Sequence, residues 1–169
     1  TIDVEEWFHS ENIAPYIERR NFDHSSLHIM NQLLSDLRDN GIRGTFFFLG
    51  ELAREHKKLV QTVHEAGHEI ASHGWDHKLI NNMTYNQLKE DIRKSTDVLE
   101  NIIQEKVVGY RSPCFSQSTY LEEILLDFGY QYTSNGIESS LHDRYAANSV
   151  QQKAIVDFPL PVARLWFIK

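Results

Sequence analysis

Cysteine is nearly absent from this sequence. Cys114 is the only one among 169 residues, so an internal disulfide is excluded and nothing argues for an oxidising compartment. Long apolar runs are also missing: no stretch of about 18 apolar residues is available to span a bilayer as a helix. No charged-then-apolar leader precedes Thr1, and the chain starts directly in a strand-like segment, so we expect that an upstream segment has been cut off.

Basic residues are in the minority. The sequence has 17 Lys and Arg against 24 Asp and Glu, which gives a formal net charge of -7. Because no basic stripe is present to neutralise a phosphate backbone, we expect no nucleic-acid partner. The hydrophobic content of 41% suits one compact domain over residues 1–169, with a core large enough to hold a rigid site.

Short β-rich runs alternate with longer helical patterns, which is typical of parallel strands joined by crossover helices. The pattern predicts strands at 1–4, 44–49, 69–71, 107–110, 130–132 and 155–158. It predicts helices from Ser25 or Ser26 to Gly41, over 52–66, from the N-cap Thr84 onward, and over 121–128, with a polar loop at 135–152. In a β/α barrel the carboxyl ends of the strands meet on one rim, so polar residues after different strands are expected to face one cavity.

Two histidines follow the third predicted strand, in the segment Ser72-His73-Gly74-Trp75-Asp76-His77. If this segment turns helically, His73 and His77 present both imidazoles to one divalent ion. Two imidazoles, one carboxylate and a water fit zinc or another borderline metal. Taken alone, the pair also fits two surface histidines, since the chain contains nine.

Carboxylates end the first predicted strand. Strand alternation places Asp3 and Glu5 on one face and Val4 on the other. Two carboxylates on one face repel each other unless a cation lies beside them, in which case one binds the ion and the other accepts a proton from water. Without a cation, the same pair fits acids that simply meet solvent.

An arginine follows the fourth predicted strand, in Gly109-Tyr110-Arg111-Ser112-Pro113-Cys114-Phe115. Arg111 is expected to clamp Asp3 bidentately, and the backbone amide of Cys114 is expected to point into the site. An ordinary ion pair followed by a turn proline fits these residues equally well. Cys114 is not expected to be a nucleophile, because nothing in its surroundings supplies a base.

These motifs together resemble the polysaccharide deacetylase family, also called the NodB-homology domain or carbohydrate esterase family 4. The resemblance rests on Asp3-Val4-Glu5-Glu6-Trp7-Phe8, Gly44-Thr45-Phe46-Phe47, Gly67-His68-Glu69-Ile70-Ala71-Ser72-His73 with His77, and Gly109-Tyr110-Arg111-Ser112-Pro113. His142-Asp143-Arg144-Tyr145 and Asp157-Phe158-Pro159-Leu160 look like later segments of its bacterial branch associated with exopolysaccharide and O-antigen clusters.

The resemblance implies an α/β fold, a distorted (β/α) barrel of the NodB type, whose C-terminal part we expect to be missing here. It implies a metal-dependent hydrolase that removes acetyl groups from the N-acetylated sugars of a polysaccharide or glycan precursor. Such a protein would be bacterial, and we expect it in the cytoplasm. The late segment that carries the family's proton-donating histidine does not occur before Lys169.

Site residues are carried over one by one. The resemblance implies that Asp3 is the general base, that His73 and His77 bind a divalent metal, most simply Zn²⁺, and that Arg111 orients Asp3. The amide of Cys114 would lie in the oxyanion hole. The commonest family pattern has two adjacent aspartates, whereas Val4 occupies the second position here. Branches with an Asp-Val-Asp pattern use the carboxylate two residues on, so we assign Glu5 as the third metal ligand.

Two other functions fit the same residues. A non-catalytic carbohydrate-binding or regulatory barrel would keep the metal and lose turnover, and a related hydrolase would act on a small cyclic amide. The sequence leaves open which glycan is bound, which metal is used and what the oligomeric state is.

Overall fold

The computed structural model describes residues 1–10, 13, 16, 25–138 and 155–161. Its main sheet has six parallel strands in the order β1-β2-β3-β4-β5-β7. These strands are β1 (Ile2–Val4), β2 (Thr45–Phe48), β3 (Glu69–Ser72), β4 (Gly109–Tyr110), β5 (Tyr132–Thr133) and β7 (Val156–Asp157). A second sheet pairs β6 (Ile137–Glu138) with β8 (Leu160–Pro161), also in parallel. The predicted parallel α/β architecture is confirmed.

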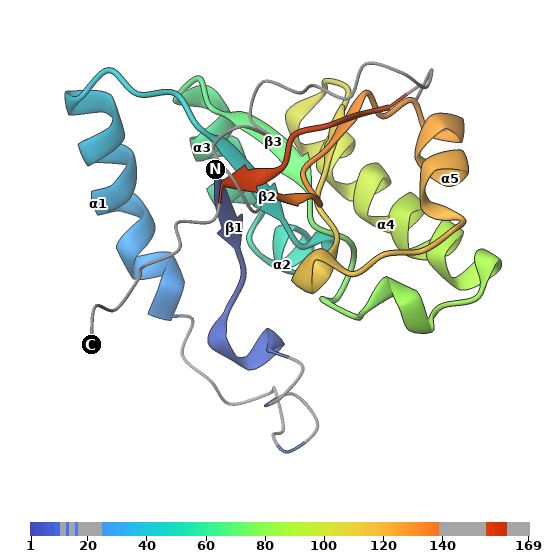
Figure 1. Cartoon of the computed structure of the whole chain (residues 1–169). Helices are drawn as coiled ribbons and strands as arrows, with labels where there is room; N and C mark the ends of the chain where they lie inside the picture. Colours follow the sequence, from blue (N-terminus) through green and yellow to red (C-terminus); the bar gives the residue numbers. More distant parts are fainter. Residues whose placement is uncertain (11–12, 14–15, 17–24, 139–154, 162–169) are drawn as a thin grey trace, which may run out of the picture.

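Helices pack around the sheet, as Figure 1 shows. The α-helices are α1 (Ser25–Asp39), α2 (Gly50–Glu55), α3 (Lys57–Glu65), α4 (Tyr85–Ile103) and α5 (Leu121–Asp127). Short 3₁₀ helices follow three strands: η1 (Trp7–His9), η4 (Ile80–Asn82) and η5 (Pro113–Phe115). Among the described residues, none of the helices is both long enough and apolar enough to cross a bilayer.

The core lies between the sheet and the helices that cover it. Phe46, Phe47 and Phe48 on β2 are all fully buried, as predicted for a strand covered on both faces. Leu88, Ile92 and Leu99 line the buried face of α4 at helical spacing. Burying such side chains contributes about 1.5–3 kcal/mol each, so the sheet is a firm base for the loops at its carboxyl end.

Helix α4 begins as its sequence predicts. Thr84 is its N-cap, and Gln87 completes a capping box in which each side chain bonds the other residue's backbone. The helix ends at Ile103, and its C-cap Gln104 adopts a left-handed conformation with φ 58°.

The single helix predicted over 52–66 is wrong, because the segment forms two helices, α2 and α3. The break is at His56, whose φ of -120° and ψ of 49° are not helical. The predicted loop at 135–152 contains strand β6 at its start, and residues 139–154, which include His142 to Tyr145 of the resemblance, lie outside the described residues.

The sheet is strongly curved. Arg111, directly after β4, hydrogen-bonds to Asp3 on β1, although β1 and β4 are three strand positions apart. In a flat sheet those strands would lie about 14 Å apart, which is beyond the reach of an arginine side chain. The curvature therefore brings the strand ends together, as expected for the rim of a barrel.

Candidate metal centre

The turn that carries the two histidines leaves β3 at Ser72 and is not helical. Gly74 and His77 have φ values of 79° and 64°, and both lie in the left-handed region. The prediction that this segment turns helically is therefore wrong. The left-handed residues nevertheless fold the chain back, so that the ring centroids of His73 and His77 lie 5.3 Å apart. A left-handed histidine is uncommon, and such strain is concentrated at functional sites.

Hydrogen bonds from two helices hold this turn, residues 73–77, which we call the histidine turn. The amides of Gly50 and Glu51, at the start of α2, donate to the carbonyls of Gly74 and Trp75, each at 2.9 Å. On the other side, the Trp75 amide donates to Asp91 Oδ1 on α4 at 3.0 Å. The turn is thus fixed between α2 and α4.

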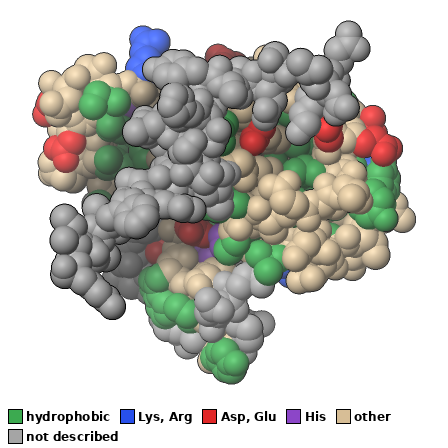
Figure 2. Space-filling view, in the orientation of Figure 1, with side chains coloured by type: hydrophobic (Ala, Val, Ile, Leu, Met, Phe, Trp, Pro, Cys, Tyr) green, Lys and Arg blue, Asp and Glu red, His purple; other side chains and the backbone are tan. Residues whose placement is uncertain are grey.

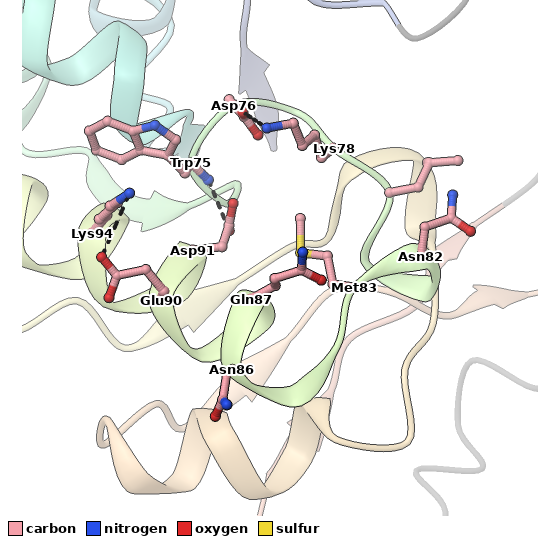
Figure 3. A pocket seen from close by; sticks show the side chains of 11 residues that line it. Trp75, Asp76, Lys78, Asn82, Met83, Asn86, Gln87, Glu90, Asp91 and Lys94 are labelled. Atoms are coloured by element: carbon pink, nitrogen blue, oxygen red, sulfur yellow. Dashed lines mark hydrogen bonds and ion pairs between the residues drawn. The ribbon is translucent and has the colours of Figure 1, made fainter.

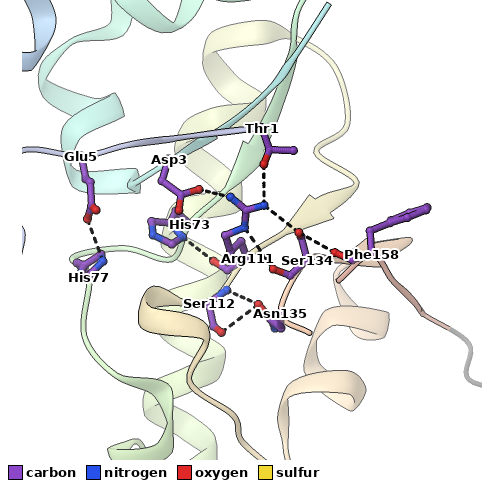
Figure 4. Close-up of polar contacts among 10 residues, drawn as sticks. All are labelled: Thr1, Asp3, Glu5, His73, His77, Arg111, Ser112, Ser134, Asn135 and Phe158. Carbon is purple, nitrogen blue, oxygen red and sulfur yellow. Dashed lines mark hydrogen bonds and ion pairs between the residues drawn. The ribbon is translucent and has the colours of Figure 1, made fainter. Parts of the chain in front are cut away.

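Glu5, His73 and His77 converge at the carboxyl end of the sheet. One ligand atom from each lies within 4.8 Å of the other two. Glu5, one residue past the end of β1, places Oε2 2.9 Å from Nε2 of His77. Figure 4 shows these side chains pointing toward one another, and the space-filling view shows acidic and histidine side chains next to each other in a recess (Figure 2).

The tautomer of His73 is set by its neighbour. Its Nδ1 lies 2.8 Å from the carbonyl oxygen of Arg111. Because a carbonyl only accepts, Nδ1 carries the proton and Nε2 keeps a lone pair for a metal. A ligating histidine commonly donates its other ring nitrogen in this way, which fixes the orientation of the ring.

The electrostatics of the site suit a cation. Burial raises the pKa of Glu5, but the hydrogen bond with His77, and the attraction of the neighbouring histidines when they are protonated, bring this pKa below its ordinary value. Burial lowers the pKa of His73, although Asp3 opposes this. Glu5 is therefore held as a carboxylate and His73 as a neutral imidazole, the two forms that bind metals.

A divalent ion fits these residues. Glu5 Oε2 is buried, and the contact printed for it among the described residues is the ion pair with His77 Nε2 at 2.9 Å. Because a buried carboxylate is stabilised by nearby positive charge, this oxygen would also accept a cation. One carboxylate and two imidazoles form a donor set that zinc accepts, with a further position left for water.

Arg111 holds Asp3, the predicted general base, in place beside the metal ligands. Its side chain is 3% exposed, and one terminal nitrogen contacts Asp3 Oδ1 at 2.5 Å. The other terminal nitrogen donates to Thr1 Oγ1 and to Ser134 Oγ, and Nε donates to the Ser134 carbonyl. The contact with Asp3 is therefore made through one nitrogen and not bidentately, because the rest of the guanidinium is engaged by Thr1 and Ser134.

Cys114 lies on η5, directly after the segment that carries Arg111. Its side chain is exposed, and its φ of 51° is left-handed, as is that of Phe115 at 54°. The fold of this turn is fixed by Asn135, which accepts from the Ser112 amide at 2.8 Å. The part that the Cys114 amide plays stays a prediction.

Sequence reasoning missed the residues that support Arg111. Ser134 directly follows β5, so the rule that polar residues gather at strand ends would have found it. Ser134 Oγ in turn donates to the Phe158 carbonyl beside β7 at 2.9 Å. Thr1 and the ring of Phe47, 4.1 Å from the guanidinium carbon, carry no comparable signal in the sequence.

Comparison with known proteins gives consistent matches. The model of the family described as polysaccharide deacetylase matches residues 20–133. The peptidoglycan deacetylase of Helicobacter pylori is 26% identical over 101 residues, which are 60% of this chain and 34% of that protein. The peptidoglycan-N-acetylglucosamine deacetylase of Bacillus cereus is 26% identical over 100 residues, which are 59% of this chain and 34% of that protein.

A solved structure shares the fold. A Mycobacterium smegmatis protein assigned as a polysaccharide deacetylase superposes with a TM-score of 0.68 at 27% identity, covering 78% of this chain and 45% of that one. The chain spans about a third of the length of the two curated relatives.

Proposed function

Because this chain belongs to the polysaccharide deacetylase family, whose model matches residues 20–133, we propose that it carries the metal-binding part of a hydrolase that removes acetyl groups from N-acetylated sugars. One observation carries the proposal: Glu5 and the buried His73 and His77 form one donor set, and Asp3 is held beside it by Arg111. Relatives named as peptidoglycan deacetylases support an N-acetylated glycan as the substrate class.

Each site residue has a separate role in the proposed reaction. Glu5, His73 and His77 would hold the divalent ion, which when bound supplies Lewis-acid polarisation of the acetyl carbonyl and of water. Asp3, whose side chain is 28% exposed, is the general base that takes a proton from the attacking water. Arg111 keeps the Asp3 carboxylate oriented. The Cys114 amide stabilises the oxyanion, a contribution that is typically about 3 kcal/mol for one donor.

Finer assignments belong to the same proposal. Zinc is the ion that best matches two imidazoles and one carboxylate. The segments Asp3-Val4-Glu5-Glu6-Trp7-Phe8 and Asp157-Phe158-Pro159-Leu160 support the bacterial branch associated with exopolysaccharide and O-antigen clusters. A bacterial cytoplasm is our prediction for the compartment.

Two substitutions test the proposal. Asp3→Asn should retain metal and lose acetate release from tetra-N-acetylchitotetraose, because it removes only the base. His73→Ala should lose both, because it removes a ligand. His64→Ala is the matched control, since His64 lies away from this site in contact with Glu105 at 3.3 Å. Full acetate release by Asp3→Asn would overturn the base assignment.

One observation favours a non-catalytic carbohydrate-binding barrel as the second candidate. The position that carries a second aspartate in the commonest family pattern is Val4, which is 2% exposed and packs in the core. Metal and glycan binding by the unaltered protein without any acetate release would establish this alternative.

A further inference from the structure

A cavity of about 650 Å³ lies on the outer side of the histidine turn, between residues 75–79, η4 and the first turns of α4. Figure 3 shows the side chains that line it. Its volume falls within the range of small-molecule sites in proteins, about 300–1,000 Å³. Neither Glu5 nor His73 and His77 lines it, so this cavity is separate from the candidate metal centre.

The lining combines apolar surface with hydrogen-bonding groups. Leu79 and Met83 supply apolar side chains, and Asn82 and Asn86 supply side-chain amides. Asp76 and Glu90 add carboxylates to the lining. Amides and carboxylates accept hydrogen bonds from the hydroxyl groups of a ligand.

Charges around the cavity largely cancel, because three carboxyl groups line it, those of Asp76, Glu90 and Asp91, against the ammonium groups of Lys78 and Lys94. Lys78 lies 2.5 Å from Asp76, and Lys94 lies 3.6 Å from Glu90. An anionic ligand such as a phosphate would meet the carboxylates, and a cation would meet both ammonium groups. A purely apolar ligand would displace water from the amides of Asn82 and Asn86 without replacing its hydrogen bonds. A neutral ring with hydroxyl groups and one apolar face would hydrogen-bond to these amides and cover Leu79 and Met83.

We propose that this cavity is a second binding site, which takes a neutral sugar unit of the glycan. The inference rests on the proposed function only for the class of ligand, since a chain acting on glycans meets neutral sugar rings. The site shares the histidine turn with the metal centre: Asp76 and Lys78 line the cavity, and His77 between them faces Glu5. A sugar bound here therefore touches the segment that positions a metal ligand.

The test measures binding in the absence of turnover. Metal-free protein, prepared with a chelator, is titrated calorimetrically with tetra-N-acetylchitotetraose. Asn86→Trp places a large side chain at the cavity and should raise the dissociation constant by about tenfold or more. Asn101→Trp is the matched control, because Asn101 is also exposed on α4 but does not line the cavity; its dissociation constant should equal that of the unaltered protein.

A second pair of variants carries smaller substitutions, which are less able to disturb folding. Asn82 lines the cavity and its neighbour Asn81 does not, so Asn82→Ala should weaken binding and Asn81→Ala should not. The proposal is overturned if the unaltered protein does not bind the tetrasaccharide, or if Asn86→Trp and Asn82→Ala bind it as tightly as their controls. Acetate release by the metal-loaded protein is measured separately. The binding result can therefore be interpreted even if the deacetylase proposal fails.

Discussion

Arg111 connects more of the site than any other single residue. Its guanidinium joins Asp3 and Thr1 to Ser134, and its backbone carbonyl accepts from His73. It also stacks 4.1 Å above the ring of Phe47. The same residue therefore orients the predicted base through its side chain and a predicted metal ligand through its backbone. Replacing the side chain separates these two effects, since the backbone carbonyl remains.

Arg111→Lys should cost about 3 kcal/mol of folding free energy, because one ammonium cannot replace the four hydrogen bonds made by a buried guanidinium. Acetate release should fall while metal binding persists, since the carbonyl that fixes His73 is retained. Chemical denaturation and metal titration measure the two quantities. Arg93→Lys, on the exposed face of α4, is the control and should change stability by no more than about 0.5 kcal/mol. Unchanged turnover in Arg111→Lys would refute the orienting role.

Asp91 makes the stability of the histidine turn depend on pH. Burial raises its pKa to about 7, although the hydrogen bond from the Trp75 amide opposes the rise. Asp76 adds to the increase, whereas Lys78 and Lys94 reduce it. In the unfolded chain the pKa of an aspartate is about 3.9, so between the two values the native state holds a proton that the unfolded chain has lost.

The stability that Asp91 contributes is complete below about pH 4 and is lost as the pH rises through about 7, at a rate of about 1.4 kcal/mol per pH unit. Asp91→Asn removes this titration and keeps an acceptor for Trp75. Its stability relative to the unaltered protein should therefore increase from pH 5 to pH 8, as measured by denaturant midpoints. Asp97→Asn, exposed on the same helix, should show no such trend. A pH-independent difference for Asp91→Asn would contradict the assignment.

At the scale of elements, the histidine turn depends on how closely α2 approaches α4. Gly50, the first residue of α2, is buried against the Trp75 ring and the backbone of Ser95 on α4. A methyl group at position 50 would lie 2.7 Å from a ring carbon of Trp75 and 2.9 Å from the Cα of Ser95. Both distances are too short for carbon atoms, so only glycine allows this packing.

Gly50→Ala should therefore separate α2 from the turn, lower stability by about 1–3 kcal/mol and weaken metal binding. Gly44→Ala serves as the control, because a methyl group there would meet Phe46 at 3.6 Å, an ordinary contact. Thermal unfolding and metal titration of both variants check the expectation. Equal metal affinity in the two variants would show that the turn does not need this packing.

The elements that local pattern determines were predictable, and those that distant contacts determine were not. Strand β2 followed from a continuous apolar run, and the start of α4 followed from its capping box, because both signals lie within a few residues. The conformation of the histidine turn depends on Glu51 and Asp91, which approach it from two helices. The break at His56 likewise has no counterpart in the apolar spacing.

At the scale of the whole molecule, the candidate site is a product of sheet curvature. Strand-end reasoning grouped Asp3, Glu5, His73, His77 and Arg111, and the structure brings these five together. The rule works because parallel strands have a common direction, so their carboxyl ends share one edge. The rule gives no distances. It therefore does not predict that the guanidinium of Arg111 hydrogen-bonds to Thr1 and Ser134 as well as to Asp3.

Metal binding should stabilise the whole fold, because its ligands come from segments far apart in sequence: Glu5 follows the edge strand β1, and His73 and His77 follow β3. An ion that binds only the native state stabilises it by about 2.7 kcal/mol at a concentration one hundred times its dissociation constant. Chelation should therefore lower the unfolding temperature, and zinc should restore it. In His73→Ala the unfolding temperature should not respond to zinc, whereas in His64→Ala the full response should remain. A response that survives in His73→Ala would place the ion elsewhere, and the three residues could no longer be regarded as its ligands.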